Sequence, residues 1–244
     1  MAARAVRSFR AQTYANKRLL IYDNGKDAAR PEEILDNETY FGCFWNAHRG
    51  MLTIGQLRHE ANGHAFASHF HPKILIHWDD DDYSHPARIA EQVALLQASG
   101  ADAVGYREML FWRTTSVCLE GAVTEMHQPV NEAWLYSHHR ADHALGTSLC
   151  YWRRTWERKP FADLPKGPGG TGEDHQWREG LKVVSQTALG GPSLSDDDAP
   201  RMIASIHGGN SSKAYDLETL IARGSKEWRR VPEWDDYCAE RMKL

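Results

Sequence analysis

The chain has 244 residues, of which 41% are hydrophobic and 25% charged, a composition and length typical of one large globular domain. No apolar stretch approaches the roughly 20 residues that a membrane span requires, and residues 1–7 lack the apolar core of a secretory signal, so we expect a cytoplasmic protein with no transmembrane segment. The net charge of −4 gives no overall attraction to nucleic acid, so a nucleic-acid partner is not indicated, although the charge does not exclude one.

The hydrophobic pattern predicts helices that alternate with strands in the first half of the chain. In chain order we expect a helix over 3–12, strands over 19–22 and 40–45, a helix over 53–66, a strand over 74–76, a helix over 84–100 and a strand over 103–106. Ser84 would cap the third helix and Gly100 would end it. Strands and helices in alternation with short links are typical of an α/β fold with a mostly parallel sheet.

The second half has a less regular pattern. Segments 109–112 and 117–119 predict antiparallel strands laid across the edge of the sheet. A segment rich in glycine and proline, 164–172, predicts a loop, and the acids that follow it suit the first turn of a helix. The remaining expected elements are strands over 183–184 and 201–206 and helices from residue 213 to the end, with a break at Pro232.

Four consecutive aspartates, Asp79 to Asp82, directly follow the apolar strand at 74–76. Adjacent carboxylates repel one another unless a cation or hydrogen-bond donors lie among them, and an all-oxygen cluster is the ligand set that Mg²⁺ or Mn²⁺ prefers. If the strand stays extended, Asp79 and Asp81 face one side as a metal pair, and Asp80 and Asp82 face the other. Acidic runs are usually solvated loops, but ligands in open α/β sheets bind beyond the carboxyl ends of strands, where these acids lie.

Several short segments occur in the order and spacing of one enzyme family. They are 11–16 with 20–25, 55–61, 78–83, the pair 173–174 after the glycine-rich loop, and 206–212. Together they resemble the family 2 glycosyltransferases of the GT-A fold. The resemblance implies a GT-A-like catalytic domain over 1–212, with a single Rossmann-like, mostly parallel mixed sheet flanked by helices, and a C-terminal helical extension over 213–244.

The resemblance also implies the reaction. An inverting, metal-dependent glycosyltransferase of the hexosyltransferase type would move a sugar from a nucleotide-diphosphate sugar, expected to be a UDP-sugar, to a hydroxyl acceptor that the sequence does not identify. Charge accumulates on the departing diphosphate, and Mn²⁺ or Mg²⁺ would stabilise it. The acceptor hydroxyl loses a proton as it attacks, so the enzyme needs a general base.

The same resemblance implies roles for individual residues. Asp79 and Asp81 would hold the metal with His207, whose alternative is a structural histidine at a strand end. Asp174 would be the general base; alternatively, Glu173 is the base and Asp174 only caps the helix. The nucleotide sugar would be bound by Asp23, Asn24, Arg58, Asp79 and Asp80, and Lys26 is a further candidate for a phosphate contact.

The start of the sequence departs from the pattern of the family. Members of the family begin with an apolar strand inside the sheet, whereas this sequence begins on the predicted helix over 3–12. Either the true start lies upstream, or another segment replaces the strand, or nucleotide binding is impaired. The alternatives to a glycosyltransferase are a non-catalytic or impaired module that binds a nucleotide sugar and a metal, and a sugar nucleotidyltransferase, although the glycine-rich phosphate loop of the latter is missing.

His139 and His143 have the i, i+4 spacing of a zinc pair on a helix, with His138 beside them. The glutamate of the metalloprotease motif and a third ligand are missing, so we expect surface or acceptor-site residues rather than a zinc site. The segment 146–152 resembles the family's stretch that forms a wall of the acceptor pocket.

Overall fold

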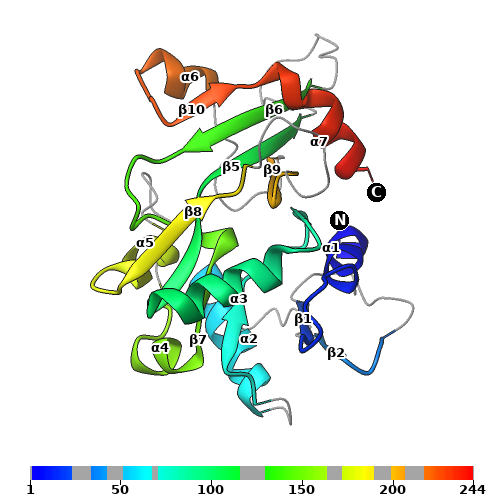
Figure 1. Cartoon of the computed structure of the whole chain (residues 1–244), viewed down its shortest axis with the longest axis vertical. Coiled ribbons are helices and arrows are strands. Elements are labelled where there is room, and N and C mark those ends of the chain that lie inside the picture. Colours follow the sequence, from blue (N-terminus) through cyan, green and yellow to red (C-terminus); the bar gives the residue numbers. More distant parts are fainter. Residues whose placement is uncertain are drawn as a thin grey trace.

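The computed structural model of the chain describes residues 2–23, 34–42, 52–67, 71–115, 130–163, 172–189, 199–206 and 217–243 (Figure 1). Some predictions lie outside these residues: the roles of Asn24, Lys26 and His207, the strand at 117–119, and most of the glycine-rich loop over 164–172.

The main sheet is built around the long strand β5 (Ala103–Thr115), drawn in green in Figure 1. The first half of β5 pairs with β7 (Cys150–Trp152), which is antiparallel, and with β8 (Val183–Thr187), which is parallel. Its second half pairs with β6 (Val130–Ser137), which is antiparallel, and with β9 (Met202–Ile206), which is parallel. One strand therefore connects both halves of the sheet.

The outer strands β3 (Ile74–Ile76), β4 (Tyr83–Ser84) and β10 (Trp228–Arg230) are antiparallel to their neighbours β7, β9 and β6. Five of the seven pairings in this sheet are thus antiparallel, and the prediction of a mostly parallel sheet is wrong. The reason is that segment 109–112, predicted as a separate edge strand, continues β5 and forms an antiparallel pair with β6. The mixed α/β class is confirmed.

A second, smaller sheet consists of β1 (Leu19–Asp23) and β2 (Glu38–Gly42), which pair in parallel. Within the described ranges, no strand joins this pair to the main sheet, so the prediction of a single sheet is also wrong. The Tyr40 hydroxyl donates to Asp23 Oδ2 over 2.7 Å and so links the two strands.

Three longer helices form where the apolar periodicity predicted them: α1 (Ala2–Arg10), α2 (Ile54–Ala67) and α3 (Arg88–Ser99). Gly100 ends α3 with φ of 58°, a left-handed conformation that glycine adopts without a steric penalty. The shorter helices are η1 (Gly146–Ser148), α4 (Arg153–Arg158), α5 (Glu173–Arg178), α6 (Leu217–Ala222), η3 (Pro232–Trp234) and α7 (Asp235–Arg241). No helix among the described segments is long and apolar enough to cross a membrane.

The predicted cap of α3 is wrong, because Ser84 belongs to β4 and the N-cap position falls on Ala87. The Ser84 hydroxyl instead accepts a hydrogen bond of 2.8 Å from Arg88 Nη1. The Ser84 side chain therefore bonds a buried arginine and does not cap the helix.

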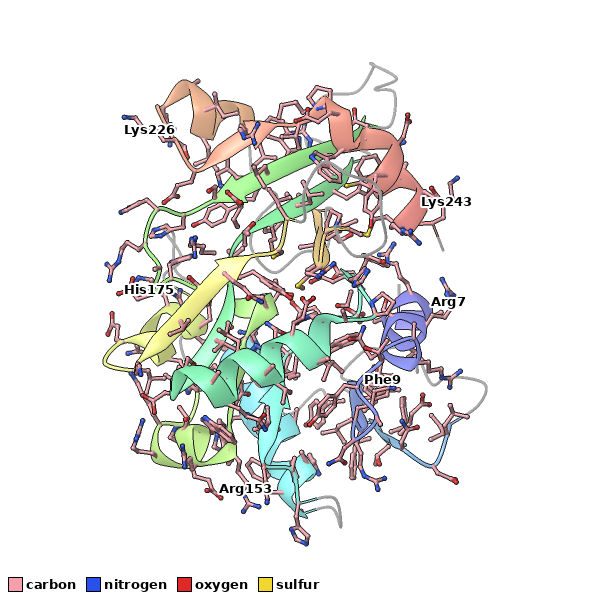
Figure 2. All side chains as sticks on the ribbon, in the orientation of Figure 1. Arg7, Phe9, Arg153, His175, Lys226 and Lys243 are labelled. Carbon is pink, nitrogen blue, oxygen red and sulfur yellow. The ribbon has the colours of Figure 1, made fainter. Side chains whose placement is uncertain are left out.

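Helix α1 packs its apolar face onto β1 and α3. Phe9, labelled in Figure 2, is 3% exposed and lies in one core cluster with Leu19, Ile89 and Val93. Its ring also meets the ring of Trp78 edge to face, with 6.0 Å between the centroids. The first helix thereby contacts the residue that immediately precedes the four aspartates.

The segment 213–244, predicted as a helical extension, is helical only in part, because β10 lies within it and joins the main sheet. Trp228 on β10 is 8% exposed, and its ring lies 4.8 Å from Phe111 and 5.0 Å from Tyr136, centroid to centroid. The end of the described chain therefore shares the core of the sheet.

We expect Trp228→Ala to lower the free energy of unfolding by about 3 to 5 kcal/mol, because it removes a large buried ring from that core. Urea denaturation measures the change. The matched control is Ile221→Ala, since Ile221 is 41% exposed on α6 and its loss should cost no more than about 0.5 kcal/mol. Equal, small effects of both variants would mean that β10 contributes nothing to the stability of the sheet.

Candidate active site

The four aspartates lie in a turn between β3 and β4, because β3 ends at Ile76 and the chain reverses at residues 80–81. The alternation expected of an extended strand therefore does not apply. Asp79 is half-buried and Asp80 exposed, whereas Asp81 and Asp82 are 9% and 5% exposed. We call residues 79–82 the acidic turn.

Asp82 is anchored by two hydrogen bonds from distant parts of the chain. Thr147 Oγ1 donates to Oδ2 over 2.6 Å, and the backbone N–H of Ser205 on β9 donates to Oδ1 over 3.0 Å. Burial raises the pKa of the Asp82 carboxyl well above its ordinary value, and the neighbouring Asp79 and Asp81 carboxylates raise it further. The turn is therefore fixed in place, and its burial and neighbouring carboxylates favour the neutral form of Asp82.

Two buried arginines lie against the same turn. Arg88 is fully buried; its Nη2 donates to the carbonyl oxygens of His77 and Thr147 over 3.0 and 3.2 Å. Arg4 Nη2 on α1 donates to the carbonyl oxygen of Asp81 over 2.5 Å. These bonds hold the backbone around the acidic turn. Within the described part of the chain, the Asp79 carboxylate has no hydrogen-bond or ion-pair partner, so it can bind a ligand.

Glu173, the first residue of α5, forms a close ion pair with Arg58 on α2. Burial raises the pKa of Glu173, and the Arg58 guanidinium opposes this rise. The Asp174 and Asp79 carboxylates are near enough to raise the same pKa. Arg58, predicted to contact the nucleotide, is thus bound to one of the two candidate bases.

Asp174 packs directly against the first residue of η1. A Cβ added to Gly146 would lie 2.6 Å from Asp174 Oδ2, which is closer than any real contact of this kind. The Gly146 carbonyl oxygen is 2.7 Å from His77 Nδ1. On its other side, Asp174 Oδ2 lies 3.8 Å from Arg178 Nη2 on the same helix. Only glycine therefore leaves room for this carboxylate beside η1.

The structure brings together six of the predicted residues and separates others. The acidic turn (Asp79, Asp80 and Asp81) and the group of Arg58, Glu173 and Asp174 both adjoin η1: Thr147 donates to Asp82 of the turn, and Gly146 packs against Asp174. Asp79 is also near enough to Glu173 to raise its pKa. Asp23 lies in the smaller sheet, bonded to Tyr40. Asn24 and His207 lie outside the described residues.

Sequence reasoning missed Thr147, Arg88 and Arg178. The signal for Thr147 was weak: a Gly-Thr-Ser stretch precedes strand β7, and it was interpreted only as a pocket wall. Arg88 and Arg178 carry no local signal, because a buried arginine on a helix cannot be distinguished from a solvated one by sequence alone.

Comparisons with known proteins complete this description. No protein-family model matches the sequence, and no curated protein matches it. The chain is similar to the crystal structure of S. aureus TarS 1-349 in complex with UDP, with 12% identity and a TM-score of 0.49, over 85% of this chain and 57% of that one. A second structure of S. aureus TarS 1-349 has 13% identity and the same TM-score, over 84% and 56% of the two chains.

This chain therefore spans little more than half of the structures that it matches. At this identity the similarity concerns the course of the backbone alone.

We expect Thr147→Val to destabilise the protein by about 1 to 3 kcal/mol, because it keeps the shape of the side chain but removes a hydrogen bond from a buried carboxylate. Loss of the donor raises the pKa of Asp82 further, so the destabilisation should grow as the pH rises through that pKa. Denaturant unfolding at acidic and neutral pH measures both effects.

The matched control is Thr187→Val, which removes an exposed hydrogen bond of 2.7 Å to Glu108 and should cost less than about 1 kcal/mol at either pH. If Thr147→Val behaved like this control, Thr147 would not anchor the acidic turn.

Proposed function

We propose that this chain is an inverting, metal-dependent glycosyltransferase that transfers a sugar, of hexose type, from a nucleotide-diphosphate sugar to a hydroxyl acceptor. The observation that carries the proposal is that two carboxylate groups, the acidic turn and the Glu173–Asp174 pair, both adjoin η1. A UDP-sugar is the donor that we expect.

The acidic turn fits a hard divalent cation. Its donors are carboxylate oxygens, and the Asp79 carboxylate is unpaired among the described residues. After burial, the neighbouring Asp79 and Asp81 carboxylates are the next largest causes of the raised pKa of Asp82. We propose that Asp79 and Asp81 hold Mn²⁺ or Mg²⁺, with His207 as the third protein ligand. Such an ion supplies positive charge to the departing diphosphate.

The proton would be removed by the second carboxylate group. We propose that Asp174 is the general base: its carboxylate accepts the proton of the acceptor hydroxyl as the hydroxyl oxygen attacks the anomeric carbon. The bond to the diphosphate breaks on the far side of that carbon, so the anomeric configuration inverts. Glu173 suits this role less well, because its carboxylate is already bonded to Arg58.

Asp80, Asp23 and Asn24 remain our candidates for nucleotide contacts. Arg58 takes a different place in the proposal: it positions Glu173 and sets the charge between α2 and α5. Since its guanidinium already lies at the site, it also remains within reach of a donor phosphate.

We expect Asp79→Asn to lower metal-dependent turnover of a UDP-sugar at least about 100-fold, because it removes a charged metal ligand, with the loss seen as reduced release of UDP. The matched control is Asp236→Asn, which removes an exposed carboxylate on α7 and should leave turnover unchanged. Metal and nucleotide binding by calorimetry, without turnover of any donor in a broad set, would instead favour a non-catalytic binding module.

Gly146→Ala tests Asp174 as the base. The added methyl group would displace the Asp174 carboxylate, so we expect turnover to fall by about 10- to 1,000-fold, within the range that general-base catalysis contributes, while UDP binding persists. The control is Gly63→Ala on α2, where nothing lies within 4 Å of an added Cβ, and which should keep full activity. Unchanged turnover in Gly146→Ala would move the role of base to Glu173.

A further inference from the structure

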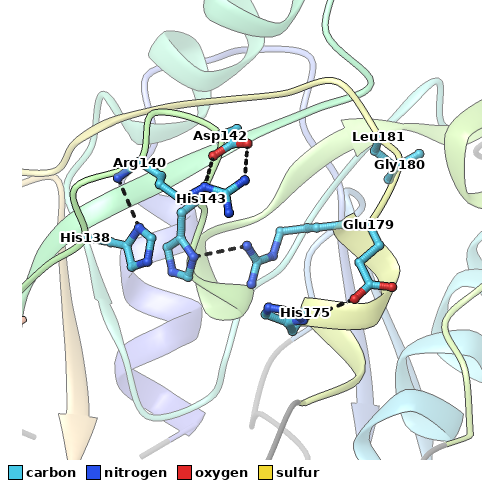
Figure 3. Close-up of a pocket in the computed structure, with 9 residues that line it drawn as sticks. His138, Arg140, Asp142, His143, His175, Glu179, Gly180 and Leu181 are labelled. Carbon is cyan, nitrogen blue, oxygen red and sulfur yellow. Dashed lines mark hydrogen bonds and ion pairs between the residues drawn. The ribbon is translucent and has the colours of Figure 1, made fainter.

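A cavity of about 380 Å³ lies between the segment after β6 and helix α5 (Figure 3). We call it the histidine pocket. Its charged and polar lining residues are His138, Arg140, Asp142, His143, His175, Arg178 and Glu179. The function proposed above uses none of these side chains.

Arg178 is the buried cation of this pocket, with a side chain only 9% exposed. Its Nε donates to the carbonyl oxygen of Asp174 over 3.1 Å, and its Nη1 lies 3.3 Å from His143 Nδ1. Nη2 lies 3.8 Å from Asp174 Oδ2, beyond hydrogen-bond distance. A guanidinium has five N–H groups, so three of them have no acceptor at bonding distance among the described residues.

The hydrogen bonds also define the protonation of two imidazoles. Arg178 can only donate, so His143 Nδ1 accepts and the proton lies on Nε2, 3.5 Å from the Tyr136 hydroxyl. The backbone N–H of Arg140 donates to His138 Nδ1 over 3.2 Å, so the His138 proton lies on Nε2, 3.4 Å from Glu227 Oε1. The two rings stack with 3.9 Å between their centroids.

This pattern argues against a metal in the pocket. His138, His139 and Glu227 have ligand atoms within 4.8 Å of one another, a spacing that a metal ion could bridge. However, the Nε2 of His138 that faces Glu227 carries a proton, and a metal ligand needs a lone pair there. The tautomer instead suits a hydrogen bond from His138 to Glu227.

The other charged groups of the pocket lie on its rim. Arg140 donates two hydrogen bonds, of 2.8 and 2.6 Å, to the Asp142 carboxylate, and both side chains are more than half exposed. His175 lies 3.7 Å from the Glu179 carboxylate, and both side chains are exposed. Arg178 is the buried cation of the pocket: its ion pair with Asp174 leaves N–H groups without an acceptor at bonding distance among the described residues, and desolvation makes an unfilled donor costly.

We propose that the histidine pocket binds an anionic oxygen group of the acceptor, a phosphate or a carboxylate, through the unfilled N–H groups of Arg178. The identification of the ligand as the acceptor rests on the function proposed above, whereas the anion site itself does not. Planar pairing of a guanidinium with such a group is strong and directional. Because Arg178 also contacts Asp174, it would act as a positioning residue that holds the acceptor beside the base.

The first test measures binding of inorganic phosphate and of acetate at constant ionic strength, without donor or metal. We expect saturable binding by the wild-type protein and a loss of affinity of at least about 10-fold in Arg178→Gln. Affinity should be partly restored in Arg178→Lys, which keeps the positive charge but not the planar guanidinium that can donate two parallel hydrogen bonds. The preferred anion identifies phosphate or carboxylate as the group recognised. The matched control is Arg158→Gln, which removes an exposed arginine on α4 that is bonded to Asp102, and it should bind as the wild type does.

A second measurement uses only the wild-type protein, so it holds even if Arg178→Gln fails to fold. Burial and, second, the nearby Arg178 guanidinium lower the pKa of His143 to about 4. An anion on Arg178 would favour the charged imidazole, so we expect phosphate to raise the pKa of His143 in an NMR titration of the histidine ring. Unchanged affinity in Arg178→Gln, or a His143 pKa that phosphate does not move, would overturn the anion site.

The acceptor role is tested by transfer to a polyol, its phosphate monoester and the corresponding carboxylic acid. We expect the charged acceptor to be preferred through a lower KM, and this preference to weaken in Arg178→Lys and to disappear in Arg178→Gln. Phosphate binding without any transfer would refute the glycosyltransferase and keep the anion site. Equal transfer to charged and neutral polyols, with no competition by phosphate, would refute the anion site and keep the glycosyltransferase.

Discussion

The hydrogen bonds that Asp82 accepts from Thr147 and from the Ser205 backbone are the contacts on which the candidate site depends. They fix the acidic turn to η1 and to β9 at the same time. Because η1 also packs against Asp174, one short 3₁₀ turn determines the separation of the two carboxylate groups. A site assembled from loops alone would not keep this separation, whereas here each side is held by a buried polar contact.

This arrangement concentrates negative charge in a partly buried place, which is unfavourable in the absence of a ligand. Arg4 and Arg88 donate to backbone oxygens around the turn, so their charges moderate the repulsion while their hydrogen bonds hold the chain. Arg58 balances Glu173 on the other side. The remaining imbalance at Asp79 is what makes the site suitable for a cation, since functional sites are commonly places where charge is not fully compensated.

Asp174 lies between η1 and the histidine pocket. Its carboxylate packs against Gly146 on η1, and Oδ2 lies 3.8 Å from Nη2 of Arg178, which lines the pocket. An arginine shared between a candidate base and a cavity couples the two, because any anion that binds the guanidinium weakens its attraction for Asp174. We therefore expect acceptor binding to affect the candidate base by local electrostatics, without any movement of the backbone.

The sequence by itself determined the local structure: the apolar periodicity of α1, α2 and α3, the end of α3 at Gly100, the strand before the aspartates and the helix that begins at Glu173 were all predicted correctly. Only the tertiary structure decided which strands pair in parallel or antiparallel, and the turn in which the aspartates lie. It also decided that Thr147 bonds Asp82 and that Arg58 bonds Glu173, partners that are 65 and 115 residues apart in the chain. The physical reason is that periodicity and capping act within a few residues, whereas strand order and the pairing of buried charges depend on which distant segments exclude water together.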